Sequence, residues 1–146
     1  MSASHYNINE SYGWLIATAS QQINQRLTRK FAEHGLNLTT EQWCLLVHLI
    51  NEDGLTQQEL AARNKRSKVT VFKLIGLLEK RGFIHRIPDP KDGRAKRVLL
   101  TEYALENKDL MLDLARENLA EVTRGFTDAD RESFKVALRK VIENSV

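Results

Sequence analysis

The sequence contains a single cysteine, Cys44, which excludes an internal disulfide framework and fits a reducing cytoplasm. It also lacks a long apolar run. The longest, residues 43–50, is interrupted by His48 and is far shorter than the ~20 residues that a membrane-spanning helix needs. No basic residue precedes Arg26 and no apolar h-region follows the start, so we expect no signal peptide. Together these absences predict a cytoplasmic protein that does not enter a membrane.

The usual motifs of catalysis are absent too. The chain has no Gly-rich phosphate loop, no nucleophile elbow and no HExxH zinc motif. His5, His34 and His85 are scattered, without the spacing of metal ligands. We therefore expect no enzyme, no metal and no cofactor. An enzymatic function would have to be shown by an activity of the purified protein.

Positive charge is distributed unevenly along the chain. Residues 63–97 hold twelve Lys/Arg and three acidic residues, a net charge of +9, whereas the rest holds ten Lys/Arg and sixteen acidic residues, a net −6. The overall value of +3 hides this division. Charge runs usually form a solvated face, but a block this one-sided inside an otherwise acidic chain favours a footprint for a polyanion.

Apolar residues recur at three- and four-residue steps over most of the chain, which is the period of an α-helix. The expected helices cover residues 8–31, 40–51, 56–63, 67–81, 101–124 and a last segment from 127. Capping boxes, which pair a hydroxyl with a side chain three residues later, are expected for Thr39 with Gln42, Thr56 with Glu59, and Thr127 with Asp130. Gly35 and Asp53-Gly54 are expected to end the first and second helices.

A short hairpin is predicted after the fourth helix. Asp92-Gly93 stands between two runs of alternating apolar residues, and this dipeptide predicts a type I′ turn with positive φ at both positions. Pro88 and Pro90 exclude a helix between the strands. We expect strands over residues 83–87 and 95–100, with a basic tip formed by Lys91, Arg94, Lys96 and Arg97.

The helix over 67–81 has two different faces. Its apolar face is formed by Val71, Leu74, Ile75 and Leu78. Its opposite face presents Val69, Lys73, Gly76 and Lys80, flanked by Thr70 and Phe72. Its start is crowded by Lys65, Arg66, Ser67 and Lys68. An ordinary amphipathic surface helix has such faces as well, but the capped helix before it and the basic hairpin after it favour a winged helix–turn–helix.

The expected fold class is therefore mainly α with an α+β wing, in one domain over residues 1–146. A winged helix–turn–helix region, 37–100, is flanked by long helices within 1–36 and 101–146. The helix over 101–124 is apolar on more than one side, with Leu112 and Leu119 on one seam and Leu114 on another. Such a helix needs more than one neighbour, so we expect the flanking helices to form a homodimer.

Three stretches carry a resemblance to a known family: LTTEQWCLLVHL, LTQQELA and KLIGLLEKRGFIHRIPDPKDGRAKRVLLT. In this order they resemble the MarR family of transcription regulators, and the likeness extends over nearly the whole chain. The most specific part is Asp92-Gly93-Arg94 followed by the strand that ends at Leu100-Thr101. The resemblance implies an obligate homodimer that binds a near-palindromic site on double-stranded DNA, with a repressor as the expected outcome.

The resemblance also implies residue roles. Ser67, Lys68, Thr70 and Lys73 fall where major-groove contacts are made. Arg94 falls where the wing enters the minor groove, on a turn supported by Asp92 and Gly93. Further DNA contacts are expected from Lys65, Arg66, Arg86, Lys91, Lys96 and Arg97, the remaining cations around the helix and the wing.

Two residues depart from the family pattern. Val69 and Phe72 occupy positions in the recognition helix that are commonly Ser or Thr. They either read thymine methyl groups in the groove or serve as packing residues. Ala104 stands where glycine is common, so the start of the following helix is expected to differ slightly.

The resemblance further implies a small, partly apolar, aromatic or anionic effector that lowers DNA affinity. Residues guessed to line its pocket are Trp14, Cys44, His48 and Met111. Cys44 and His48 lie one helical turn apart, which suits plain packing, an effector cavity, or redox or metal chemistry. Packing, with Cys44 buried, is the favoured interpretation. Peroxide-sensing members carry a cysteine in the first helix, and this chain has none there.

Two other functions stay open from the sequence. A winged helix also serves as a module for contact with protein or RNA, and a DNA binder of this kind can be constitutive, without an effector. Steep salt dependence and a preference for duplex DNA would distinguish the first from a DNA-binding regulator.

Overall fold

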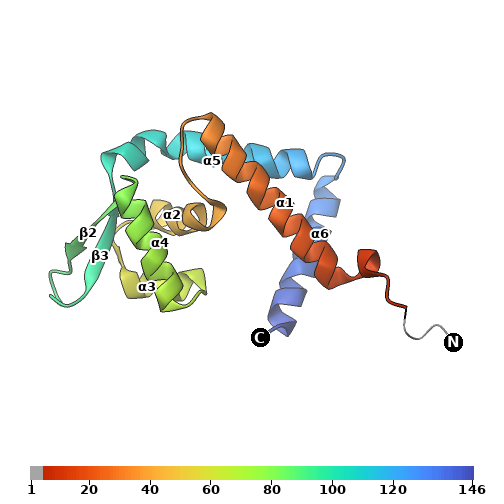
Figure 1. Ribbon diagram of the computed structural model, residues 1–146, viewed down its shortest axis with the longest axis horizontal. Helices are drawn as coiled ribbons and strands as arrows, with labels where there is room; N and C mark the ends of the chain where they lie inside the picture. Colours follow the sequence, from red (N-terminus) through yellow and green to blue (C-terminus); the bar gives the residue numbers. More distant parts are fainter. Residues whose placement is uncertain (1–4) are drawn as a thin grey trace.

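The computed structural model describes residues 5–146, which form six α-helices and a small antiparallel sheet that lies at one end of the molecule, away from α6 (Figure 1). The elements are η1 (Ile8–Glu10), α1 (Tyr12–Glu33), α2 (Thr40–Asn51), β1 (Leu55–Thr56), α3 (Gln57–Asn64), α4 (Lys68–Lys80), β2 (Ile84–Pro88), β3 (Lys96–Leu100), α5 (Glu102–Val122) and α6 (Asp128–Asn144). This order confirms the mainly α fold with a wing. The first helix begins at Tyr12 rather than at residue 8, because a separate 3₁₀ turn takes residues 8–10.

The helix starts follow the predicted capping chemistry with one difference. At α2, Thr39 Oγ1 accepts from Gln42 N at 3.3 Å and Gln42 Oε1 accepts from Thr39 N at 3.0 Å, so that box is complete. The box at Thr127 is complete as well. At α3, Thr56 Oγ1 accepts from Glu59 N, but the bond is made in one direction only, so the expected box is wrong there. Thr56 also belongs to β1, opposite Arg97 of β3.

The wing is a hairpin with a longer loop than expected. β2 pairs with β3 from Ile84 opposite Leu100 to Pro88 opposite Lys96, which leaves residues 89–95 as the loop. Neither Asp92 nor Gly93 has positive φ, so the predicted type I′ turn is wrong. Instead, two carboxylates turn the chain. Asp89 Oδ1 accepts from the backbone N of Lys91, and Asp92 Oδ1 accepts from that of Arg94, each at 3.1 Å. Such Asx turns need no left-handed residue.

A third strand, β1, was not expected from the sequence. Its two residues pair with β3 on the side away from β2, giving the order β1-β3-β2. Leu55 is buried opposite Val98, so this short strand joins the helix–turn–helix to the wing. A strand of two residues is too short to show the alternation of apolar and polar residues by which strands are predicted, so the sequence did not indicate it.

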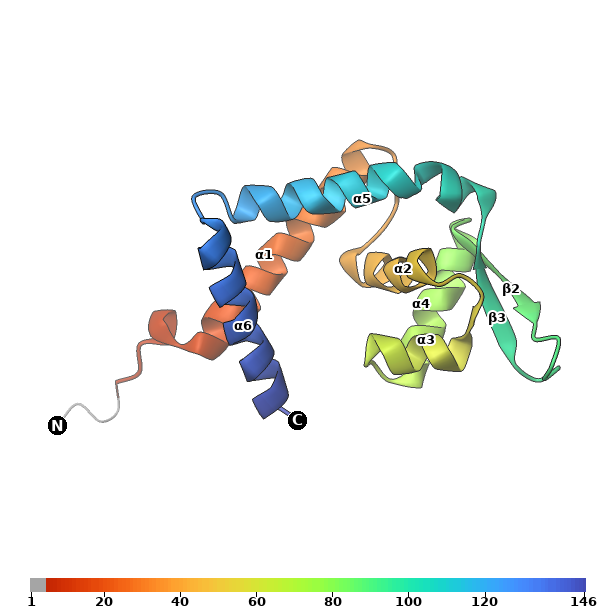
Figure 2. The same cartoon turned by 180° about the vertical axis from the view of Figure 1, so that it is seen from behind.

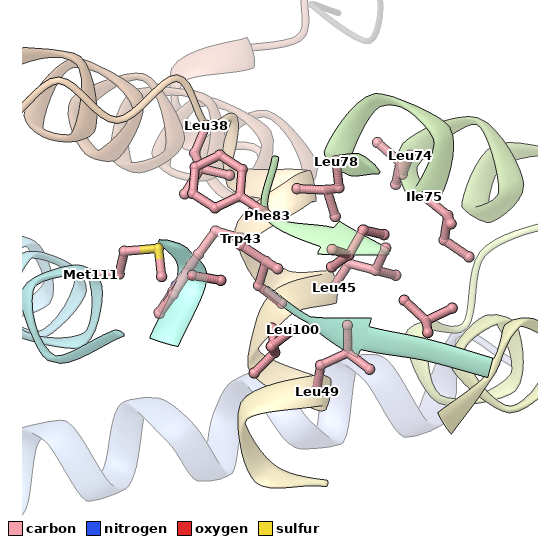
Figure 3. Packing of buried hydrophobic residues seen from close by; sticks show 14 of the residues in the cluster. Leu38, Trp43, Leu45, Leu49, Leu74, Ile75, Leu78, Phe83, Leu100 and Met111 are labelled. Atoms are coloured by element: carbon pink, nitrogen blue, oxygen red, sulfur yellow. The ribbon is translucent and has the colours of Figure 1, made fainter. Parts of the chain in front are cut away.

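The hydrophobic core lies inside the winged region, between its helices and the sheet (Figure 3). The predicted apolar face of α4 is buried, with Leu74, Ile75 and Leu78 turned toward α2 and the sheet. α5 reaches this core through Met111, which is fully buried, and Phe83 packs beside Tyr103 of the same helix. The core therefore fixes α4 and the wing as one unit, with α5 as its link to the rest.

The other end of the molecule is formed by α6, the first half of α1 and the end of α5 (Figures 1 and 2). Polar contacts clamp α1 to α5: Glu121 accepts from Arg26 and from Lys30, and the buried Asn118 accepts from Arg26. By contrast, α6 has no buried residue in the single chain. Within residues 5–146, no helix has both the length and the apolar character to cross a membrane.

Candidate nucleic-acid interface

The start of α4 is organised by Ser67. Its hydroxyl accepts from Thr70 N at 3.1 Å and donates to Thr70 Oγ1 at 2.9 Å, so the two predicted contact residues are hydrogen-bonded to each other. Lys65 adopts a left-handed conformation, φ 54°, at the end of α3. This turn brings Lys65, Arg66, Ser67 and Lys68 to the exposed N-terminal end of α4.

The outward face of α4 combines cations with exposed apolar groups. Lys73 and Lys80 are exposed one above the other, with Gly76 between them. Val69 is 66% exposed and Phe72 is 38% exposed, so neither is a core residue. Phe72 is partly covered on the flank of α4, next to the buried face, and both alternatives for its role stay open.

The cations of the basic segment fall into two groups. Among the residues that the structure describes, no ion pair is made by the exposed Lys65, Lys68, Lys73, Lys80, Lys91, Arg94 and Lys96. Their charge is therefore uncompensated over the start of α4 and the tip of the wing. The remaining predicted contacts, Arg66, Arg86 and Arg97, have acidic partners within the chain.

Arg86 is engaged on three elements. From β2, its Nη2 donates to Glu79 Oε1 of α4 at 2.7 Å, and its Nη1 donates to Gln57 Oε1 of α3 at 3.1 Å. Because Arg86 donates hydrogen bonds to the carboxylate, the pKa of Glu79 lies below its usual range. The arrangement ties the wing to both helices of the helix–turn–helix.

Arg97 has a similar role near the loop end of the wing, where it lies opposite Ile87. Its Nη1 donates to the carbonyl oxygen of Gly54 at 2.8 Å, and its Nε donates to Asp89 Oδ1 at 3.3 Å. The backbone N–H of Lys91 and the Arg97 guanidinium both donate to Asp89 and hold the pKa of its carboxyl below the usual range. Asp92 acts on Arg94 through the backbone N–H only.

The wing turn was expected to be supported by Asp92, but Glu79 and Asp89 were missed. Glu79, Asp89 and Asp92 each accept hydrogen bonds that shape the wing. Their isolation inside a block of twelve cations was the available signal, because an acid kept in such surroundings is typically paired. Gln57 had no such signal, since its contact with Arg86 depends on how β2 crosses α3.

The four residues guessed for an effector pocket are not brought together. Met111 is fully buried in the core (Figure 3). Trp14 lies ten residues before Asn24, where α1 meets α2 through the Thr40 hydroxyl, and thus about 15 Å away along the helix axis. Cys44 and His48 share one side of α2, but Cys44 is exposed, so the expected burial is wrong. Within residues 5–146, no cluster of three His, Cys, Asp or Glu side chains suits a metal ion.

Cys44 does not have the character of an activated thiol. Partial burial of the sulfur raises the pKa of the Cys44 thiol, the charge of Arg66 lowers it by less, and Glu41 raises it further. Reactive cysteines have lowered values, because the thiolate is the nucleophile.

A polar groove of about 600 Å³ lies between α1 and the start of α2. Its lining consists of Gln21, Asn24, Gln25, Thr28, Arg29, Thr39, Thr40 and Glu41. A second hollow, of about 580 Å³, is apolar and lies between α1, α5 and α6, with Leu15, Ile23, Leu119 and Phe134 in its wall. None of the four guessed pocket residues lines either hollow.

Comparison with known proteins gives consistent matches. Residues 34–95 match the sequence profile of the MarR family. The chain is 32% identical over 131 residues to an uncharacterised HTH-type transcriptional regulator, YwoH of Bacillus subtilis, covering 84% of this chain and 92% of that one. It is 29% identical to the HTH-type transcriptional repressor NicR of Pseudomonas putida, covering 95% and 87%. The S. aureus MepR–DNA complex superposes with a TM-score of 0.83 at 25% identity, covering 93% and 98%.

Proposed function

The chain belongs to the MarR family of transcription regulators, and from this premise we propose that it is a dimeric repressor whose DNA affinity is lowered by a small molecule. The observation that carries the proposal is the group of exposed, unpaired cations that spans the N-terminal end of α4 and the wing tip. Such a surface suits a polyanion, because released counterions make the binding of Lys and Arg to phosphates favourable.

In the proposed complex, α4 lies in the major groove. Ser67, Lys68, Thr70 and Lys73 would face base edges and the adjoining backbone. Arg94 would enter the minor groove, where the potential is most negative in narrow A·T-rich segments. Lys91 and Lys96 would contact phosphates on either side, as would Lys65 and Arg66 at the start of α4.

Arg86 and Arg97 receive a different role in this proposal. Each donates to a carboxylate and to a further oxygen within the fold, so neither guanidinium is free to form a two-pronged contact with DNA. We assign both to positioning the wing relative to α4. The spacing between the two DNA-contacting elements is then set before binding, which reduces the ordering that binding requires.

The proposed dimer uses the helical end of the molecule. Leu119 is 56% exposed and Phe134 is 44% exposed beside the apolar hollow, and α6 has no buried residue. A single chain leaves this surface uncovered, whereas a second copy would bury it. Two-fold symmetry would place the two copies of α4 about 34 Å apart, one turn of DNA, and implies a near-palindromic operator.

The groove between α1 and α2 is the proposed effector site, in place of the four residues guessed from the sequence. It separates the helical end from the winged region, and its lining combines the exposed cation of Arg29 with hydroxyl and amide groups and with one carboxylate, Glu41. A small anionic molecule there would favour one angle between α1 and α2. A tenfold loss of DNA affinity requires only about 1.4 kcal/mol of differential binding between two arrangements.

The test is selection of bound sequences from a random DNA duplex library, followed by affinity measurements over a range of salt concentrations. We expect enrichment of a near-palindrome and a steep fall in affinity with salt. Absence of enrichment, together with binding to RNA or to a protein partner, would overturn the proposal in favour of an interaction module. Ligands that bind without releasing the DNA would leave a constitutive repressor.

A further inference from the structure

Val69 and Phe72 are exposed apolar side chains on the same helix as Lys68 and Lys73, and we propose that they read the C5-methyl groups of thymines in the operator. This inference rests on the proposed function and adds a specificity to it. It concerns which bases are preferred, whereas the proposed function concerns whether duplex DNA is bound at all.

The geometry of α4 separates these two residues from the core. Val71, Leu74, Ile75 and Leu78 are buried on one side of the helix. Val69 lies on the opposite side, one turn before Lys73, and Phe72 lies on the flank between Val69 and the buried face. Val69 is 66% exposed, whereas Phe72 is 38% exposed and so is partly covered by its neighbours while part of its ring faces solvent.

The exposure of Val69 and Phe72 is not explained by stability. Valine and phenylalanine are weaker helix formers than the alanine, lysine or glutamate that suit an exposed helical position. An exposed aliphatic or aromatic side chain also does not stabilise the fold through the hydrophobic effect, because its apolar surface stays in contact with water. A contact made in the complex does explain them, and that contact must be apolar because neither side chain can donate or accept a hydrogen bond.

The major groove offers one apolar group at its floor, the C5-methyl of thymine. The uncompensated charges of Lys68 and Lys73 lie within one turn of Val69 and would hold α4 against the phosphates on both sides. The Ser67 hydroxyl donates to Thr70 Oγ1 at 2.9 Å, so polar contacts with DNA near the helix start would come mainly from Lys68, Lys73 and the Thr70 hydroxyl, and the apolar pair adds a contact of another kind. The surface therefore has both features that reading thymine methyls requires. Its cations attract the phosphates that line the groove, and its two apolar side chains can contact the methyl groups.

The experiment replaces thymines of the selected duplex by deoxyuridine, one position at a time, and measures the affinity of the full-length protein. Uracil removes only the methyl group and keeps the base pairing. We expect one or two positions in each half-site to weaken binding about fourfold per methyl, equivalent to about 0.8 kcal/mol. Replacing cytosine by 5-methylcytosine at positions away from these thymines should have no effect.

Matched variants connect the effect to the two residues. In Val69→Ala and Phe72→Ala, uracil at the sensitive positions should no longer weaken binding, because the partner of the methyl is gone. Val136→Ala, the same exchange on an exposed part of α6, should keep the full uracil sensitivity.

Selected duplexes whose thymines can all be replaced without loss would overturn the inference while leaving the proposed function intact. Uracil sensitivity that persists in both α4 variants would also overturn it, since the methyl would then act through DNA shape. Failure to select any duplex would overturn the proposed function itself.

Discussion

The Glu79 carboxylate on α4 accepts three hydrogen bonds from Arg86 on β2. Oε1 receives Nη2 at 2.7 Å, and Oε2 receives Nε at 3.3 Å and the backbone N at 3.1 Å. This fork fixes the first strand of the wing against the recognition helix. The two elements proposed to enter adjacent grooves are therefore joined by one acid and one base, in addition to the core beneath them.

Glu79→Gln is expected to lower stability in a pH-dependent way. Because Arg86 depresses the pKa of Glu79, the carboxylate stabilises the fold above its ordinary value of 4.5, and this contribution is lost as the pH falls through the lower folded value. The free energy of unfolding should be about 0.5–1 kcal/mol lower for the variant than for the wild type near neutral pH, because solvent screens this partly exposed ion pair. The difference should shrink below pH ~4. Urea unfolding at several pH values measures it.

The control for this prediction is Glu132→Gln, which removes a single 3.4 Å contact with Lys135 on α6. It should change stability little at any pH. A constant difference between wild type and Glu79→Gln from neutral to acidic pH would contradict the assigned role of the carboxylate.

Lys73→Ala and Arg94→Ala are expected to weaken DNA binding in different ways. Lys73 projects from the outward face of α4, so its loss should cost about 1–3 kcal/mol on the selected duplex and relax the preference at one base pair. Arg94 lies on the wing tip, so its loss should weaken binding to selected and unrelated duplexes alike. Titrations against both kinds of duplex measure this.

Arg63→Ala is the control, because Arg63 pairs with Glu52 at 2.6 Å. Unchanged affinity in both test variants would refute the docking geometry.

The helical end is expected to hold two chains together. At micromolar concentration, sedimentation should give a dimer for the wild type. Leu119→Asp should weaken the dimer about a hundredfold or more, because each leucine buries apolar surface and two-fold symmetry counts the loss twice. Leu77→Asp changes another exposed leucine, on α4, and should remain dimeric. A folded wild-type monomer would exclude the proposed assembly.

Arg29→Ala is expected to reduce the response to anionic effectors. Arg29 is the only cation in the lining of the groove between α1 and α2, so its loss should weaken binding of aromatic carboxylates about tenfold, as for a lost charge-assisted hydrogen bond. DNA affinity without ligand should stay the same. Calorimetry with a panel of aromatic carboxylates, alongside DNA release, provides the measurement. Arg116→Ala, a change on the exposed side of α5, is the control. Equal ligand binding by both variants would place the effector elsewhere.

The sequence was most informative where a local pattern decides the structure. The buried face of α4 follows from four apolar residues at helical spacing, and the cap at Thr39 follows from a hydroxyl and an amide three residues apart. The wing loop was misjudged because Asp89 and Asp92 hydrogen-bond to backbone N–H groups two residues later, and this overrides the turn that Asp92-Gly93 favours.

The candidate site was less predictable, because it depends on contacts between distant segments. The engagement of Arg86 with Glu79 requires the register of β2 beside α4, which no local pattern encodes. Cys44 was expected to be buried because α2 is apolar on nearly every side, but whether each side is covered depends on the placement of the neighbouring helices. The same limitation explains why Trp14 and Met111 were wrongly combined in one pocket.

Gly76→Ala is expected to stabilise the free protein and to weaken DNA binding. Gly76 lies inside α4 without positive φ, and an added Cβ would meet nothing within 4 Å, so neither the backbone nor the packing requires glycine. Alanine should then raise the free energy of unfolding by about 0.5–1 kcal/mol, the difference in helix propensity.

Gly76 stands between Lys73 and Lys80 on the face proposed to enter the groove, where an absent side chain allows close approach to DNA. The added methyl should therefore weaken operator binding about fivefold, equivalent to about 1 kcal/mol. Thermal unfolding and DNA titration measure the two effects, with Gly13→Ala in α1 as the control that leaves DNA affinity unchanged. If Gly76→Ala gains stability and binds DNA as tightly as the wild type, the outward face of α4 does not approach the bases, and the docking geometry fails at its centre.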